Sequence, residues 1–181
     1  GQSMTARTTP PFRADMVGSL LRSAPVKEAR EKKAAGTISD AELAAIEDRE
    51  IADLVKKQVA VGLQAVTDGE FRRSFWHFDF LENLDGVIGV ETEGIAFAGV
   101  TTKGHGVRVK GKIDFTEAHP HLAHFKFLKS VTPAGHVAKM TIPSPSMLHY
   151  RGGRKAVEFG AYREMDAYYA DLGAAYAKAI K

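Results

Sequence analysis

The chain has 181 residues, no cysteine and a formal net charge of +3 at pH 7. This length suffices for one domain with a real core, and 44% hydrophobic and 26% charged residues are ordinary for a globular protein. The lack of cysteine excludes disulfides, zinc thiolate ligands and a thiol nucleophile within this chain. No apolar run approaches the roughly 20 residues that span a membrane, and no signal peptide is visible, so we expect a cytoplasmic protein with no membrane partner.

The amino-terminal residues carry two patterns. Gly1-Gln2-Ser3-Met4 resembles the remnant of a removed tag, so we expect residues 1–11 to be a disordered start and residues 12–181 to form the domain. Ala14 to Ser19 then predicts a short strand that runs into a loop.

Two helices and a second strand follow. Pro25 marks the first position of one helix. Ser39 begins the next helix, and Glu42 completes a capping box three residues later. Apolar residues at helical spacing continue to Gly62, and a buried strand follows over residues 63–67. Strand, helices and strand in this order favour a parallel sheet.

The middle of the chain changes character. Glycines punctuate short β-prone pieces from about residue 85 to 115, which predicts a β-ribbon inserted into the α/β unit. A third core strand, Val137–Ile142, ends at Pro143, because proline cannot continue a central strand.

The last predicted helix runs from about Tyr162 to Ile180. Its apolar face comprises Met165, Tyr169, Leu172, Tyr176 and Ile180. Three parallel strands are too few to close a barrel, and an open sheet leaves bare edges. We therefore expect a truncated, amino-terminal portion of a larger α/β protein, which could form homo-oligomers through those edges.

The turn after the second strand carries the strongest candidates for function. Ligands of α/β proteins bind at the carboxyl ends of strands. Glu70 suits binding an ammonium group or moving a proton. Asp68 has the same position in the fold but can equally be structural, because Asp-Gly is a common turn. Arg72 and Arg73 could bind an anionic group or pair with the acids.

Three other groups extend this candidate site. Trp76 and His77 begin an aromatic cluster that could cover a planar ligand or simply pack beneath a loop. Ser144 and Tyr150 follow the third strand. Val17-Gly18-Ser19 leaves the first strand, where its hydroxyl and backbone N–H groups could hold a carboxylate. Beside Glu70, this segment suits the carboxylate and ammonium groups of an amino acid.

Other classes of site find little support. Residues 101–129 are rich in basic residues, and we expect them to form a solvated basic hairpin. An anionic ligand is the next interpretation, and a nucleic-acid surface is the last, because aromatic residues are too few among them. His119, His121 and His124 lie in the same stretch without obvious partner carboxylates, so we expect no metal site. The chain has no P-loop, Rossmann fingerprint or nucleophile elbow.

Three strings together carry a family resemblance. RADMVGSLLR (13–22), AVGLQAVTDGEFRRSFWHFDFL (60–81) and TIPSPSMLHYRGG (141–153) resemble the cobalamin-independent methionine synthases, most closely short members similar to the C-terminal catalytic barrel of that enzyme. The resemblance implies part of a TIM (β/α)8 barrel. It also implies transfer of a methyl group from a methyl-folate co-substrate to a thiol such as homocysteine, activated by zinc.

The resemblance also implies roles for individual residues. The Val17-Gly18-Ser19 segment would contact the amino-acid substrate, Glu70 would bind its amine, and Tyr150 would be the counterpart of an aromatic residue that contacts the folate. The zinc ligands of the family are His, Cys, Glu and Cys from later strands, which this chain lacks. We therefore expect the chain alone to be inactive, although its parent would resemble a 5-methyltetrahydropteroyltriglutamate–homocysteine methyltransferase.

Two alternatives stay open. The chain could be a non-catalytic half-barrel that associates with itself. It could also belong to a related zinc-free barrel enzyme, such as a decarboxylase of acidic tetrapyrroles, whose arginine-rich pocket would explain Arg72, Arg73, Arg151 and Arg154.

Overall fold

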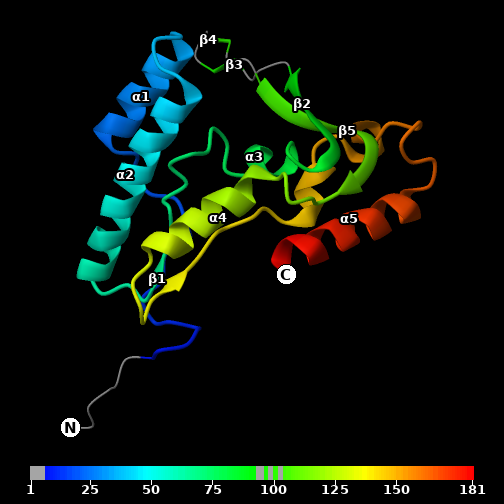
Figure 1. The fold of residues 1–181 in the computed structure, drawn as a ribbon. Coiled ribbons are helices and arrows are strands. Elements are labelled where there is room, and N and C mark those ends of the chain that lie inside the picture. The colour runs from blue at the N-terminus through cyan, green and yellow to red at the C-terminus, as the bar shows by residue number, and fades with distance from the viewer. Residues whose placement is uncertain (1–6, 93–95, 98–99, 102–103) are drawn as a thin grey trace. The chain divides into compact units, whose positions relative to one another are not determined.

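A computed structural model describes residues 7–92, 96–97, 100–101 and 104–181 (Figure 1). The helices are α1 (Ala24–Ala34), α2 (Asp40–Ala60), α3 (Phe78–Leu81), α4 (Pro120–Val131) and α5 (Met165–Ile180), with 3₁₀ helices η1 (Pro145–Leu148) and η2 (Gly153–Ala156). The strands are β1 (Ala65–Val66), β2 (Asp85–Thr92), β3 (Ala96–Phe97), β4 (Val100–Thr101), β5 (Gly104–Asp114) and β6 (Val137–Ala138).

The chain divides into two compact units, which are described separately. The first unit comprises Gly1–Arg73 and Ala123–Thr141, and the second comprises Ser74–Leu122 and Ile142–Lys181. The tag remnant predicted at residues 1–4 lies outside the described residues.

Helices α1 and α2 of the first unit begin with the residues that the sequence predicted. Proline stands in the first turn of α1, and α2 begins with the expected capping box, in which Ser39 Oγ accepts from Glu42 N at 3.1 Å and Glu42 Oε2 accepts from Ser39 N at 2.7 Å. Figure 1 shows α1 and α2 side by side. Val26, Ile51 and Phe71 form one small core, and Val55, Val66 and Leu128 form another.

The parallel sheet of the first unit is smaller than predicted. β1 pairs in parallel with β6, Ala65 opposite Val137 and Val66 opposite Ala138. The strand expected over residues 14–19 is wrong: this segment is a loop, and Val17 is 84% exposed. Side chains hold its backbone instead of a ladder, because Thr67 Oγ1 donates to Gly18 O at 2.9 Å and Lys139 Nζ donates to Met16 O. The α/β class is therefore confirmed, with two parallel strands among the described residues where three were expected.

An antiparallel ribbon dominates the second unit. β2 pairs with β5 from Val87 opposite Val109 to Thr92 opposite Gly104 (Figure 1). At Gly86 the backbone turns with φ of 79°, and a Cβ there would lie 2.4 Å from Lys112 O. This turn therefore requires glycine. β3 and β4 form a separate short antiparallel pair.

The face of helix α5 that packs on the ribbon agrees in part with the predicted one: Leu172 and Tyr176 are buried as expected and Met165 packs against the same core, but Tyr169 and Ile180 are not part of it. Tyr168, Leu172 and Tyr176 are buried, whereas Tyr169 is 49% and Ile180 is 74% exposed. The adjacent Tyr168 is buried, and its hydroxyl lies 2.8 Å from His149 Nδ1 within the unit.

Among the described residues, no helix is both long and apolar enough to cross a membrane.

Helix α4 was not predicted. The basic stretch that contains it was expected to be part of a solvated hairpin. Instead Leu128 is fully buried in the first unit, and His119 and His121 are buried in the second. His119 Nε2 lies 2.8 Å from Phe80 O, and burial lowers the pKa of His119, which favours a neutral ring in a structural role.

Candidate functional site

The turn from Asp68 to Arg73 has an unusual backbone. Gly69 and Glu70 both adopt left-handed conformations, with φ of 66° and 59°. A Cβ on Gly69 would lie 2.6 Å from Leu54 Cδ2, so glycine is required there. A left-handed glutamate costs about 1 kcal/mol or more, and such strain clusters at ligand sites. Asp68 stabilises the turn because its Oδ1 accepts from Glu70 N at 2.9 Å, which gives it the structural role considered above.

Two buried contacts fix the Glu70 carboxylate. Thr141 Oγ1 donates to Glu70 Oε1 at 2.8 Å, and Arg73 Nη1 lies 3.6 Å from the same oxygen. Arg73 Nη2 also donates to Thr141 O at 2.6 Å, so the three residues form a closed triangle. The side chains of Arg73 and Glu70 are only 4% and 10% exposed. The result is a preorganised carboxylate at the end of β1.

The structure brings Gly18 to this carboxylate. A Cβ on Gly18 would lie 2.8 Å from Thr141 Cγ2 and 3.3 Å from Glu70 Oε1, and the backbone there has φ of 156°. Gly18 itself is buried, whereas Val17 and Ser19 on either side are exposed. The loop therefore passes directly against Glu70 and has its two flanking residues open to solvent.

Arg72 is engaged elsewhere in the first unit. Its guanidinium pairs with Asp48 and lies 3.5 Å from Glu47 Oε1, both in α2, and it stacks over the Phe127 ring. Burial raises the pKa of Glu47, and the attraction of Arg72 opposes that rise. Arg72 is thus a structural anchor of α2 in this fold, although the sequence made it a candidate for binding substrate.

Thr141 and Arg73 complete the Glu70 site. The pairing of Arg73 with an acid is among the roles that the sequence suggested, whereas Thr141 was not a candidate. Thr141 lies within the predicted third strand, so the strand order could have indicated its position beside the other strand ends. Its hydroxyl contact depends on side-chain geometry that spacing does not encode.

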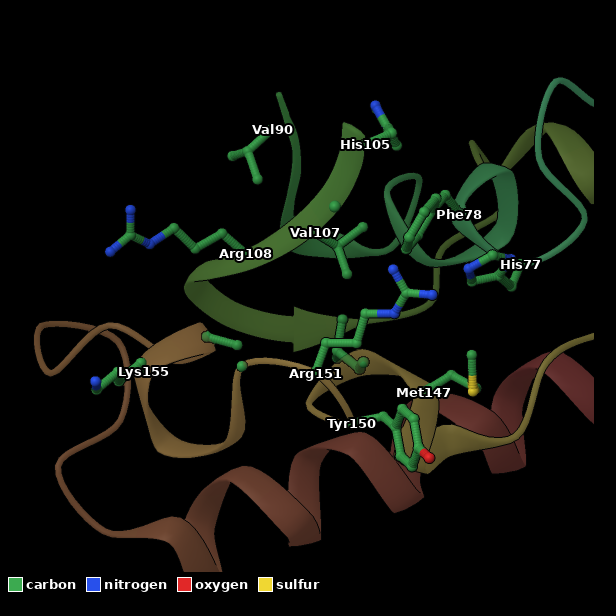
Figure 2. Close-up of a pocket in the computed structure, with 14 residues that line it drawn as sticks. His77, Phe78, Val90, His105, Val107, Arg108, Met147, Tyr150, Arg151 and Lys155 are labelled. Carbon is green, nitrogen blue, oxygen red and sulfur yellow. The ribbon is translucent and has the colours of Figure 1, made fainter. Parts of the chain in front are cut away.

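The second unit contains a separate pocket of about 410 Å³ between the ribbon and the 3₁₀ helices (Figure 2). Its lining residues are His77, Phe78, Val90, His105, Gly106, Val107, Arg108, Met147, Leu148, Tyr150, Arg151, Gly152, Lys155 and Ala156. In Figure 2 the Arg151 side chain extends between Tyr150 and Met147 on one side and the ribbon on the other, toward Phe78 and His77.

This pocket is cationic. Arg108, Arg151 and Lys155 line it, and none of its lining residues is acidic, although Arg108 Nε lies 3.7 Å from Glu158 Oε1 outside the lining. His105 Nε2 lies 2.7 Å from Glu82 Oε2, which is outside the lining. Burial, and then the nearby Arg151, lower the pKa of His77, whose Nδ1 has no hydrogen-bond partner among the described residues. Such a pocket suits a ligand that combines a planar group with negative charge.

The predicted residues of the second unit divide into two groups. His77 and Tyr150 line the pocket, and Tyr150 is 74% exposed. Trp76 and Ser144 do not line it: Trp76 is half-exposed and packs on His77 at 4.6 Å between ring centroids, and Ser144 Oγ lies 3.0 Å from Ser146 Oγ. Arg108 was missed, although the alternating Val107-Arg108-Val109 predicts its exposure on one face of the ribbon.

The donor groups of this chain do not fit the zinc implied by the resemblance. No group of three His, Asp or Glu side chains within the described residues is arranged to hold a metal ion, and the sequence lacks the family's two cysteine ligands. No chemical step below is therefore derived through a metal.

No family model matches the chain. The uncharacterized proteins YxjH and YxjG of Bacillus subtilis are both 51% identical to it, over 100% and 99% of this chain and 47% of their own lengths. A segment of 77 residues, 42% of this chain, is 35% identical to 10% of the 5-methyltetrahydropteroyltriglutamate–homocysteine methyltransferase of Nitrobacter winogradskyi.

Comparison with solved structures also finds B12-independent methionine synthases. A Listeria monocytogenes protein, provisionally assigned as a vitamin-B12-independent methionine synthase, matches with a TM-score of 0.77 and 47% identity over 94% of this chain and 47% of that one. The B12-independent methionine synthase of Shewanella sp. W3-18-1 matches with a TM-score of 0.50 and 19% identity over 77% of this chain and 41% of that one, which is a likeness of fold alone.

The fold and the comparisons together show an α/β chain whose fold is similar to that of B12-independent methionine synthases. More particularly, the chain is similar to the vitamin-B12-independent methionine synthases, which confirms the resemblance in its sequence. It spans about half the length of the relatives that it matches over most of its own length.

Proposed function

We propose that this chain binds the amino-acid acceptor in a methionine-synthase-like methyl transfer that belongs to methionine biosynthesis. Glu70 accepts the ammonium group of a homocysteine-like thiol. The backbone N–H groups of Val17, Gly18 and Ser19, with the Ser19 hydroxyl, hold its carboxylate. The observation that carries this proposal is the Glu70 carboxylate, which is buried, oriented by Thr141 and in direct reach of Gly18.

The charges of this site match those of an amino acid. A carboxylate accepts at two oxygens with about four lone-pair positions. The two contacts described for the Glu70 carboxylate, from Thr141 and from Arg73, are both made to Oε1. The ammonium group of the acceptor therefore binds Oε2, where a charge-assisted hydrogen bond stabilises it.

The pocket of the second unit is the proposed site of a methyl-folate-type donor. Tyr150 offers an exposed aromatic face to a planar ring, and Arg108, Arg151 and Lys155 offer positive charge to a carboxylate tail. His77 adds a neutral nitrogen with spare hydrogen-bonding capacity.

Activation of the thiol is not assigned to this chain. Zinc would hold the thiol as a thiolate in such a reaction. Since the donor groups here do not fit zinc, this chain supplies the binding and orientation of substrate. The metal ligands would come from other residues of the full-length protein. The chain alone is accordingly expected to bind ligands without turnover.

The decarboxylase alternative loses its main support. That interpretation needs arginines that are available to acidic groups of a substrate. Arg72 pairs with Glu47 and Asp48, Arg73 lies against Glu70, and Arg154 donates to Val157 O and Tyr162 O. Of those four arginines, Arg151 is the one that lines a pocket.

Titration of L-homocysteine into the protein, followed by calorimetry, tests the proposal. Glu70→Gln keeps the shape of the side chain and removes its charge. Loss of a hydrogen bond to a charged group costs about 1.5–3 kcal/mol, so the variant should bind roughly 10- to 150-fold more weakly. Asp48→Asn, outside the site, serves as the control. Equal affinity of Glu70→Gln and the wild type would refute the assignment of the amine to Glu70.

A further inference from the structure

The position of Thr141 relative to Glu70 points to a function beyond packing. Thr141 lies next to each of the three residues that surround the proposed amine position, Glu70, Arg73 and Gly18. Its hydroxyl donates to Glu70 Oε1 at 2.8 Å, its carbonyl accepts from Arg73 Nη2 at 2.6 Å, and its methyl and hydroxyl groups face the Gly18 backbone. No other residue in the described part of the first unit is shown with contacts to these three groups together.

We propose that Thr141 is the positioning residue that gives the site its selectivity for an amine. This inference rests on the proposed function of Glu70. A threonine hydroxyl has one proton to donate, and here that proton goes to Oε1. The carboxylate is thereby fixed about its last torsion, and Oε2 is directed to the position of the ligand's ammonium group.

Arg73 cannot replace this function of Thr141. Its Nη1 lies 3.6 Å from Oε1, which is longer than a hydrogen bond, and its shorter contact is to the Thr141 carbonyl. Arg73 therefore supplies compensating charge, whereas Thr141 supplies the short directional bond. Without the hydroxyl, the carboxylate can rotate toward Arg73 and close a direct pair, which removes Oε2 from the ligand.

The consequence is specific to ligands that carry an ammonium group. A ligand with a hydroxyl in place of the amine does not depend on a directed carboxylate charge to the same degree. Loss of the Thr141 hydroxyl should therefore weaken binding of the amino acid much more than binding of its hydroxy analogue. A side chain that only fills space would affect both ligands alike.

A pair of conservative variants tests this inference. Thr141→Val removes the hydroxyl and keeps the branched shape, and Thr141→Ser keeps the hydroxyl. Calorimetry measures binding of L-homocysteine and of 2-hydroxy-4-mercaptobutyrate to the protein expressed from its complete reading frame, with thermal unfolding as the check of folding. We expect Thr141→Val to bind homocysteine about tenfold more weakly and the hydroxy analogue within about twofold of wild type, since a net hydrogen bond changes affinity by about that factor. Thr141→Ser should retain at least half of the wild-type affinity for homocysteine.

The outcomes separate this inference from the proposed function. If Thr141→Val is folded and binds homocysteine as well as wild type, or if it weakens both ligands equally, the inference is overturned. Equal weakening by Thr141→Ser and Thr141→Val also overturns it. Glu70→Gln in the same titrations reports on the proposed function: if that variant binds homocysteine less well while Thr141→Val does not, the function stands and only the inference fails.

Discussion

Substitution of Gly18 by alanine probes the closest approach in the proposed amino-acid site. The new Cβ would lie 2.8 Å from Thr141 Cγ2, 2.9 Å from Thr141 Oγ1 and 3.3 Å from Glu70 Oε1. The first two distances are well below van der Waals contact, and φ of 156° is itself unfavourable for alanine. Either the loop or the Thr141 side chain must move.

The size of the effect follows from the cost of overpacking, which is about 1–3 kcal/mol. The exposed residues on both sides of Gly18 allow the loop to shift outward, so we expect much of this cost to appear as lost affinity. If all of it did, homocysteine would bind about 5- to 150-fold more weakly. Calorimetry measures the affinity, and urea unfolding measures the remaining loss of stability.

Gly36→Ala is the matched control for this variant. Gly36 also has a positive φ, 75°, but a Cβ there meets no atom within 4 Å. It should lose about 1–2 kcal/mol of unfolding free energy through backbone strain and keep its affinity for homocysteine. Wild-type affinity in Gly18→Ala would refute the assignment of this loop to the substrate, as would an equal loss of affinity in Gly36→Ala.

Three further predictions concern charge and stability. Arg151→Gln should raise the pKa of His77 toward its ordinary value of 6.5, because a positive neighbour is removed while burial remains; an unchanged pKa by NMR would contradict the contact in the pocket. Burial, and next the hydrogen bond to Asp171, raise the pKa of Tyr162 from 10.0 to about 12, so the folded protein loses stability as the pH rises from 10 to 12. In urea unfolding, Tyr162→Phe should lose less stability over this pH range than wild type, and an identical loss would contradict the raised pKa. Ser39→Ala should cost about 1 kcal/mol of unfolding free energy through the lost capping box, and a cost of zero by the same method would show that α2 does not need its cap.

Local sequence determined the features that were predicted correctly. The caps of α1 and α2 lie within a few residues of the helices that they begin, and the apolar run before Asp68 leads directly into β1. The segment 14–19 has an apolar pair, Met16-Val17, next to Asp15 and Gly18, which strands disfavour, and a strand also needs a partner. Here Thr67 and Lys139 hold its backbone with side-chain hydrogen bonds, which no local pattern encodes.

The errors at the helices have similar causes. In α4, apolar residues at Leu122, Phe125 and Leu128 keep helical spacing, but interleaved histidines and lysines obscured it. In α5, two successive tyrosines offered alternative buried faces, and the hydrogen bond of Tyr168 to His149 favours the first of them. Long-range partners, rather than helix propensity, decided both cases.

The contrast between the acids that face Arg72 and the Glu70 carboxylate supports the proposal that Glu70 is the ligand group. Arg72 faces two acids, Glu47 and Asp48, so its charge is already matched within the structure. Glu70 faces one arginine at 3.6 Å and one short hydrogen bond, both at the same oxygen. Compensating charge and hydrogen bonds to the lone pairs stabilise a largely buried carboxylate. In the proposed complex an ammonium group at Oε2 would add both, and the left-handed backbone at Glu70 holds the carboxylate in position for it.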